Sequence, residues 1–133
     1  MSFVDSIKTC LKKYADFTGR ARRSEFWWFA VATFLACTIL TSITVGSALF
    51  SAAASFDLEE IASLLGSLAL VGLFSLALII PNLAVGVRRM HDIDKPGIYI
   101  LIAFIPLVGL YILYLATIEG TKGPNQYGPD PKA

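Results

Sequence analysis

The chain has 133 residues, of which 56% are hydrophobic and only 16% are charged. A soluble domain of this size has too much surface for its volume to hide so many apolar side chains, and about 25% of its residues would ordinarily be charged. Lys and Arg number 11 and Asp and Glu number 10, so the net charge of +1 excludes nucleic-acid binding through bulk positive charge. The apolar content also excludes a disordered chain. The sequence therefore predicts a membrane protein.

Residues 3–15 have the periodicity of an amphipathic helix. Val4, Ile7, Leu11 and Tyr14 recur at intervals of three or four positions, and lysines occupy other faces. The segment is too short and too charged to cross a bilayer. We expect it to lie in the membrane interface, with its apolar side toward the acyl chains and its lysines toward anionic headgroups. A helix docked on a protein partner has the same pattern.

A basic cluster follows this predicted helix. Arg20, Arg22 and Arg23 come directly after Gly19, which ends the helix. Basic residues beside a membrane span usually keep that end of the chain in the cytoplasm, and anchoring of this kind explains most of the pattern. Three arginines within four positions exceed what anchoring requires. We therefore identify them as candidate interaction or ion-pair residues.

The first apolar stretch begins with recognisable helix-start and interface signals. Ser24 is a suitable N-cap, which would place Glu25 near the positive end of the helix dipole. Trp27 and Trp28 follow, and indole rings favour the level of the lipid headgroups. We predict Glu25 to be part of the candidate interaction surface and the two tryptophans to be interface anchors.

Three stretches contain no charged residue: 26–56, 61–87 and 96–118. Each is long enough for a spanning helix, which needs about 20 residues. The predicted fold is an all-α membrane protein, a single domain over 1–133 with three transmembrane helices after the interfacial helix. Pro106 and Gly109 divide the third stretch. We favour a kinked or tilted spanning helix there over a re-entrant hairpin, because lipid cannot satisfy the open backbone of a hairpin unless protein covers it.

The distribution of basic residues predicts the orientation. Six precede the first apolar stretch, none lies in the first loop, three lie in the second loop and two in the tail. Basic flanks remain in the cytoplasm, so we expect the N-terminus and second loop there and the acidic first loop outside. Three crossings then place the tail outside, whereas a re-entrant hairpin would return it to the cytoplasm.

The second loop carries the most distinctive charged segment, which starts with Arg88 and Arg89. If the preceding helix continues, Arg88 shares a face with His91 and Asp92. Local ion pairing in a basic loop is the simplest interpretation. Alternatively, Asp92 or a nearby aspartate, Asp94, pairs with an arginine of the 20–23 cluster, because the topology places both segments on one membrane face.

A third interpretation makes His91 and Asp92 an acid–base unit, which we disfavour because adjacent helical residues point about 100° apart. His91 is the only histidine, so the sequence predicts no zinc site and no other metal or cofactor site. We also predict no catalytic residues, since no recognised catalytic motif is present. Cys10 and Cys37 are expected to be free thiols in a cytoplasm-facing protein.

Residues 119–133 form a turn-rich tail. Tyr127 is the large apolar side chain available to hold the tail in place, against headgroups or a loop. Asn125, Gly128 and Pro129 complete a spacing typical of defined turns. We expect a docked tail rather than a freely moving terminus.

Three motifs in order resemble the bacterial inner-membrane family called domain of unknown function 805, and together they extend over nearly the whole chain. They are FTGRARRSEFW at 17–27, RRMHD at 88–92 and GTKGPNQYGPDP at 120–131. Met90 stands where leucine is more usual in that family. The resemblance implies a small multi-pass protein of the bacterial inner membrane, without an established activity, substrate or cofactor.

The leading functional hypothesis is a non-enzymatic membrane module whose basic cytoplasmic face binds anionic phospholipid headgroups or a membrane-protein partner. A homo-oligomer is a second possible assembly, and no nucleic-acid partner is expected. The first alternative is an oligomeric channel or transporter component for small solutes. The second alternative is an interfacial enzyme that uses His91.

Overall fold

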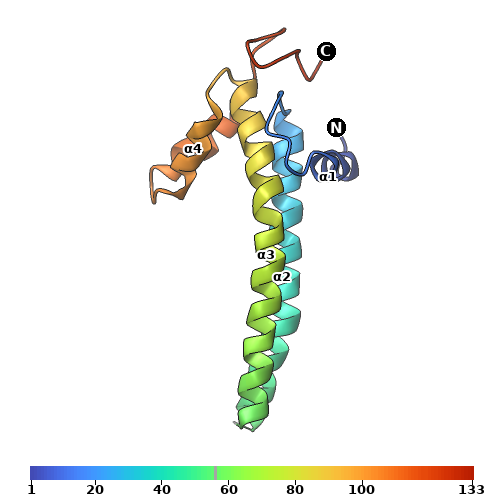
Figure 1. Cartoon of the computed structure of the whole chain (residues 1–133), viewed down its shortest axis with the longest axis vertical. Coiled ribbons are helices and arrows are strands. Elements are labelled where there is room, and N and C mark those ends of the chain that lie inside the picture. Colours follow the sequence, from blue (N-terminus) through green and yellow to red (C-terminus); the bar gives the residue numbers. More distant parts are fainter. Residues whose placement is uncertain (56) are drawn as a thin grey trace. The chain divides into compact units, whose positions relative to one another are not determined.

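A computed structural model describes residues 1–55 and 57–133. Phe56, the last residue of the first predicted apolar stretch, lies outside the described residues. The regular elements of the described chain are all helical, which confirms the all-α prediction (Figure 1). In chain order they are α1 (Phe3–Lys12), α2 (Arg23–Ala54), α3 (Leu58–Asp92), the 3-10 helix η1 (Gly97–Phe104) and α4 (Gly109–Thr117).

The first helix, α1, begins at the predicted residue and ends before the predicted 3–15 segment does, because Lys13 is its C-cap. The Asp5 backbone N–H donates to Ser2 Oγ at 3.2 Å, so Ser2 is the N-cap. Asp5 in the first turn and Lys12 in the last turn complement the helix dipole. The residues of α1 that the protein buries are Ser6 and Cys10.

Two long helices, α2 and α3, have 32 and 35 residues and are apolar enough to cross a membrane. They contain most of the first two predicted spans, which supports those two spans by length and composition. Pro81 lies inside α3 without ending it. The expected N-cap is wrong, because α2 already begins at Arg23 and Ser24 lies within the helix.

The third spanning helix expected over 96–118 is not confirmed. This stretch forms η1 and α4, which pack against each other and are joined through Ile105–Val108. Pro106 cannot donate a backbone hydrogen bond, and Leu107 adopts a φ of 64°, outside the helical region. A Cβ at Gly109 would lie 2.6 Å from the Ala103 carbonyl oxygen, so this close turn requires glycine.

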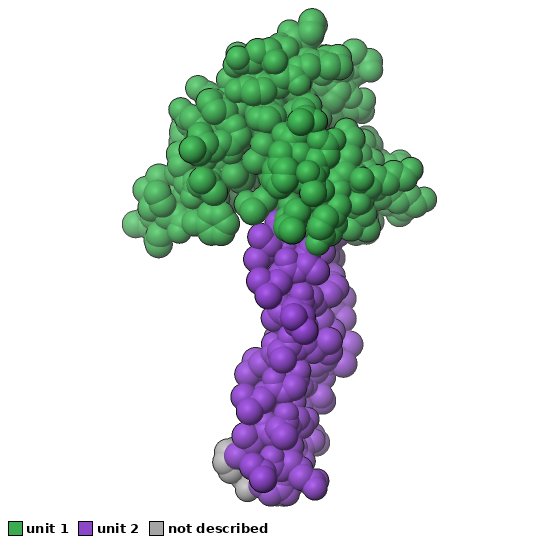
Figure 2. Space-filling view, viewed as in Figure 1, with its two compact units in different colours: residues 1–30, 80–133 green, residues 31–79 purple. Residues whose placement is uncertain are grey.

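The chain forms two compact units (Figure 2). Unit 1 comprises 1–30 and 80–133, and unit 2 comprises 31–79. In unit 2 the apolar parts of α2 and α3 lie side by side and antiparallel, and large side chains such as Phe50 and Leu73 are 82% and 67% exposed. Outward apolar side chains of this kind suit a lipid environment.

Unit 1 contains two small apolar clusters. In one, Cys10 of α1 packs with Ala21, Phe29 of α2 and Val85 of α3. In the other, Met90 near the end of α3 packs with two residues of α4, Ile112 and Leu115. These clusters hold α1 and α4 against the adjoining ends of α2 and α3, and the polar groups described next lie among them.

Candidate functional site

A buried carboxylate, Asp92, joins two arginines of unit 1. Gly19, with a φ of 77°, turns the chain after α1 so that Arg20 reaches the last turn of α3. Arg20 Nε donates to Asp92 Oδ1 at 3.0 Å, and Arg89 Nη1 donates to Asp92 Oδ2. All three side chains are at most 3% exposed. The predicted pairing of Asp92 with the 20–23 cluster is confirmed.

The same two arginines also hold the C-terminal segments. Arg20 Nη1 donates to the Gly123 carbonyl at 2.6 Å, and Arg20 Nη2 donates to the Thr121 carbonyl. Arg89 Nε donates to the Ala116 carbonyl at 3.3 Å, and Arg89 Nη2 donates to the Ile118 carbonyl. Because Arg20 and Arg89 are fixed by Asp92, these bonds fix the end of α4 and the start of the tail.

A second buried pair joins Arg88 to Glu25. Arg88 Nη1 donates to Glu25 Oε1 at 2.6 Å, and the side chains are 0% and 5% exposed. Cys10 Sγ lies 3.8 Å from the same oxygen and donates to it. Burial, together with the nearby Glu25 charge, raises the pKa of the Cys10 thiol to about 12. Among the described residues, Arg88 Nε and Nη2 have no hydrogen-bond partner.

His91 connects α3 to the tail and to the loop after α1. Its ring stacks on Tyr127 with centroids 4.0 Å apart and an angle of 3° between the planes. His91 Nδ1 lies 3.0 Å from the Gly19 carbonyl oxygen, which can accept only if Nδ1 carries the proton. Asn125 Nδ2 donates to the His91 carbonyl at 2.9 Å. Through these contacts His91 holds the tail and the loop after α1 in position.

The tail forms a defined turn, as its sequence predicts. Asn125 and Gly128 exchange backbone hydrogen bonds of 3.0 and 3.1 Å, and Gly128 has a φ of 137° that favours glycine. Asp130 accepts from the backbone N–H groups of Lys132 and Gly123, which lower the pKa of its carboxyl. The tail is therefore docked in unit 1.

The remaining predicted residues are distributed around this centre. Arg22 donates to the Pro131 carbonyl, whereas the Arg23 side chain is 45% exposed and lies 3.8 Å from Glu119. Trp27 Nε1 donates to the Ala116 carbonyl at 3.3 Å, so this ring serves packing inside unit 1. Trp28 is exposed and contacts Phe3 edge to face at 5.6 Å. Pro129 is exposed.

Sequence reasoning identified Glu25 as a candidate interaction or ion-pair residue but missed its partner, Arg88, and it missed the roles of Cys10 and the tail carbonyls. A glutamate in a first helical turn is fully explained by the dipole, so nothing in the sequence indicates its pairing with Arg88. Arg88, His91 and Asp92 were predicted to share a helix face. The residue of α3 that pairs with Asp92, however, is Arg89 and not Arg88.

The sequence profile of the family described as "Protein of unknown function (DUF805)" matches residues 14–129. The chain belongs to this family. The match includes the Asp92 cluster and the docked tail. This DUF805 protein is 39% identical over 123 residues to "Inner membrane protein YhaI" of Escherichia coli K12, covering 92% of this chain and 91% of YhaI.

It is also 31% identical over 130 residues to "Inner membrane protein YhaH" of the same strain, covering 97% of this chain and 98% of YhaH. No solved structure matches this DUF805 protein. The relatives and the two candidate spans identify it as a protein of the inner-membrane type. Within 1–55 and 57–133, no three His, Cys, Asp or Glu side chains are grouped so that they could hold a metal ion.

Proposed function

We propose that this DUF805 protein is a non-enzymatic inner-membrane module that binds anionic phospholipid headgroups through α1. The observation that carries the proposal is which side chains of α1 the rest of unit 1 covers and which it leaves exposed. It buries Ser6 and Cys10, and it leaves Val4 and Leu11 of its apolar stripe 53% and 49% exposed. An apolar stripe that the protein does not cover is available to the acyl boundary of a bilayer.

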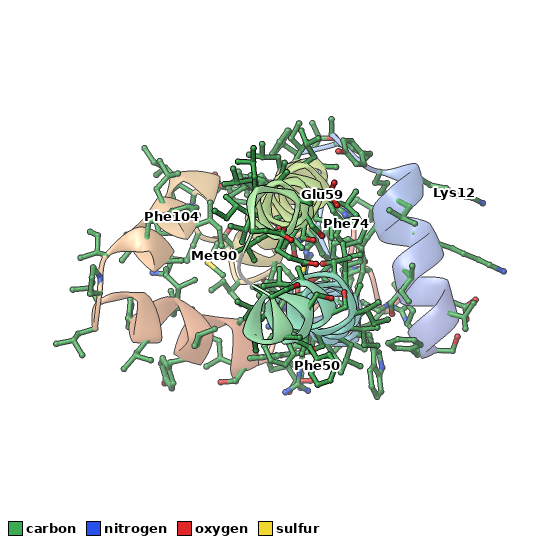
Figure 3. All side chains as sticks on the ribbon, turned by 90° about the horizontal axis from the view of Figure 1, so that it is seen from below. Lys12, Phe50, Glu59, Phe74, Met90 and Phe104 are labelled. Carbon is green, nitrogen blue, oxygen red and sulfur yellow. The ribbon has the colours of Figure 1, made fainter. Side chains whose placement is uncertain are left out.

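The charged side of α1 adjoins this stripe. At about 100° per residue, Lys8 and Lys12 lie next to Val4 and Leu11, on the side away from Ser6 and Cys10. Figure 3 shows Lys12 extending outward from the helix. Lysines in this position would meet phosphate groups while Leu11 contacts acyl chains, and each basic residue near an anionic surface contributes about 1 kcal/mol to membrane binding.

The arginines first considered for lipid binding have a different role. Arg20, Arg88 and Arg89 are buried and paired with carboxylates. A guanidinium fixed in this way is not free to recognise a headgroup. His91 is likewise held by Gly19 and Tyr127, which favours a structural role over the acid–base alternative.

The cytoplasmic orientation of unit 1 is part of the proposal and rests on charge. All 11 basic residues lie in unit 1, whereas unit 2 has three acidic residues, Asp57, Glu59 and Glu60, and no basic residue. Positively charged flanks remain on the cytoplasmic side during membrane insertion. The cytoplasmic leaflet is also the anionic one, so the lysines of α1 would face their ligand there.

The proposal is tested with the full-length protein reconstituted in nanodiscs of mixed phosphatidylglycerol and phosphatidylcholine. The charge-removing variant is Lys8→Gln with Lys12→Gln, and the matched control, Lys95→Gln with Lys122→Gln, removes the same charge elsewhere in unit 1. Extraction with limiting detergent followed by lipid mass spectrometry measures the phosphatidylglycerol retained. We expect a clear loss for the α1 variant and retention near the wild-type amount for the control.

The apolar contribution has its own variant, Leu11→Ser, which should also reduce retained phosphatidylglycerol because the exposed stripe is weakened. Equal losses in the α1 variant and the control would contradict a specific role of α1. Unchanged retention in both α1 variants, with a correctly inserted protein, would overturn the proposed function.

A further inference from the structure

The two ends of the segment 93–120 are joined to each other. Both the backbone N–H and Oγ1 of Thr121 donate to the Asp92 carbonyl, each at 2.8 Å. Arg89 adds its bonds to the Ala116 and Ile118 carbonyls. Since a hydrocarbon core is about 30 Å thick, a segment whose ends touch cannot have them on opposite faces. η1 and α4 are therefore two arms of one closed hairpin.

The surface of this hairpin is largely apolar: no charged residue occurs over 96–118, and its polar groups include the hydroxyls of Tyr111 and Tyr114, which are 47% and 61% exposed. Figure 3 shows hydrocarbon side chains projecting outward from both arms. Near the tip, Phe104 and Leu107 are 71% and 84% exposed, and on the arms Ile98 and Leu110 are 69% and 63% exposed. A helix that lies in the plane of the membrane interface has a strongly charged or polar face, and these two arms carry no charged side chain.

Most backbone donors at the tip are used within the hairpin. The N–H groups of Ile105 and Gly109 donate to the Ile102 and Ile105 carbonyls at 3.0 and 2.8 Å, and that of Val108 donates to the Pro106 carbonyl at 2.8 Å. Pro106 has no N–H to satisfy. The Leu107 N–H is the donor at the tip without a partner among the described residues, and since an unsatisfied group in hydrocarbon costs several kcal/mol, the apolar surface of the hairpin must outweigh it.

The length of the arms determines how far the hairpin can reach. η1 has eight residues and α4 has nine, so at rises of about 2.0 and 1.5 Å per residue each arm is roughly 15 Å long. This is about half of a hydrocarbon core of about 30 Å.

We infer that the η1–α4 hairpin inserts into a single leaflet of the bilayer, where phospholipid acyl chains cover its exposed surface and its tip stops near the midplane. The polar cluster around Asp92 stays at the headgroup level and holds both arms. The chain then crosses the membrane twice, and its N-terminal segment and tail lie on the same face. This inference does not depend on lipid recognition by α1.

The inference is tested by nitroxide labelling of the full-length Cys37→Ser protein in liposomes. Labels are placed singly at Ile98, Leu107 and Thr117, and Leu73 of α3 supplies a lipid-facing reference and the exposed Ala133 an aqueous one. Collision rates with oxygen and with a water-soluble nickel chelate report depth. We expect Leu107→Cys to be as deep as Leu73→Cys and roughly 15 Å deeper than Ile98→Cys or Thr117→Cys.

Sidedness is measured on the same samples with a membrane-impermeant maleimide, applied to Asp94→Cys and to Ala133→Cys in oriented vesicles. Labelling from one side is expected for both, and labelling from opposite sides would overturn the inference in favour of a third crossing. A Leu107 label inaccessible to both collision reagents, with cross-linking of Leu107→Cys between copies, would show that a second copy covers the hairpin. If Leu107→Cys is poorly folded, a label at Phe104→Cys distinguishes in the same way between coverage of the hairpin by lipid and coverage by a second copy.

Discussion

Arg20 and Asp92, 72 positions apart in the chain, form an ion pair of 3.0 Å with side chains 1% and 3% exposed. Asp92 also accepts from Arg89, so one carboxylate is shared by two buried guanidiniums. The remaining N–H groups of Arg20 are used by carbonyls such as that of Gly123. Arginine is suited to this position because its fork of donors can serve a carboxylate and several carbonyls together.

Removing the Asp92 charge should therefore destabilise the protein strongly. Asp92→Asn leaves two buried arginines without a counter-charge, and breaking a buried pair in this way costs about 3–5 kcal/mol. The midpoint of thermal unfolding of the detergent-purified protein measures the effect. Asp94→Asn is the matched control, because Asp94 is exposed and accepts from Gln126 at 3.1 Å. Equal midpoints for the two variants would contradict the role given to Asp92.

The Glu25–Arg88 pair should behave differently under single and double substitution. Arg88→Met alone leaves the Glu25 carboxylate buried without the Arg88 charge, so we expect a loss of about 3–5 kcal/mol. Glu25→Leu combined with Arg88→Met removes both charges, and such replacements are often neutral or stabilising. The double variant should recover most of the lost unfolding free energy. A double variant as unstable as Arg88→Met would show that the pair is needed for more than charge balance.

The sequence predicted the contacts around Asp92 only where charge and expected topology could indicate them. Opposite charges on one membrane face made an ion pair between Asp92 and the 20–23 cluster possible, and Arg20 fulfils it. Turn residues such as Gly128 predicted the form of the tail. Tyr127 was expected to hold the tail in place, but its stacking partner, His91, could not be predicted, because that contact depends on how the tail docks in unit 1.

The third spanning helix, predicted over 96–118, was not confirmed for a related reason. Composition and length cannot distinguish a spanning helix from a hairpin, since both are free of charge. The decisive signals were local, namely the missing N–H of Pro106 and the tight turn at Gly109, whose Cβ position is occupied by the Ala103 carbonyl. The hydrogen bonds of Thr121 to Asp92 then close the segment, and no periodicity in the stretch encodes them.

Tyr127 should control how often the tail opens. Stacking of aromatic rings contributes about 0.5–1.5 kcal/mol beyond buried area, so Tyr127→Ala should raise the open population roughly 2- to 12-fold. Tyr127→Phe keeps a ring over His91 and should leave the tail closed. The rate of trypsin cleavage after Lys122 reports the open population when opening is fast relative to cleavage. Equal cleavage rates in the two variants would show that the ring does not hold the tail.

Cys10 should be almost unreactive in the folded protein, although it lies on a short surface helix. A thiol with a pKa of about 12 is ionised to about 10⁻⁴ at pH 8, against about a tenth for a cysteine with the ordinary pKa of 9.0, so alkylation should be roughly 10³-fold slower. Mass spectrometry of the Cys37→Ser protein after maleimide treatment measures this, and unfolding should restore full reactivity.

The raised pKa of the Cys10 thiol determines the direction in which its contribution to stability changes with pH. The thiol pKa is raised in the folded state from 9.0 to about 12, so the folded protein holds this proton more tightly than the unfolded chain. The contribution to stability is complete below pH 9 and is lost as the pH rises toward 12. Because the Glu25 charge contributes to the raised pKa, Glu25→Gln should lower it and speed alkylation at pH 8. Rapid alkylation of folded Cys37→Ser protein at pH 7 would contradict the buried position of Cys10 beside Glu25.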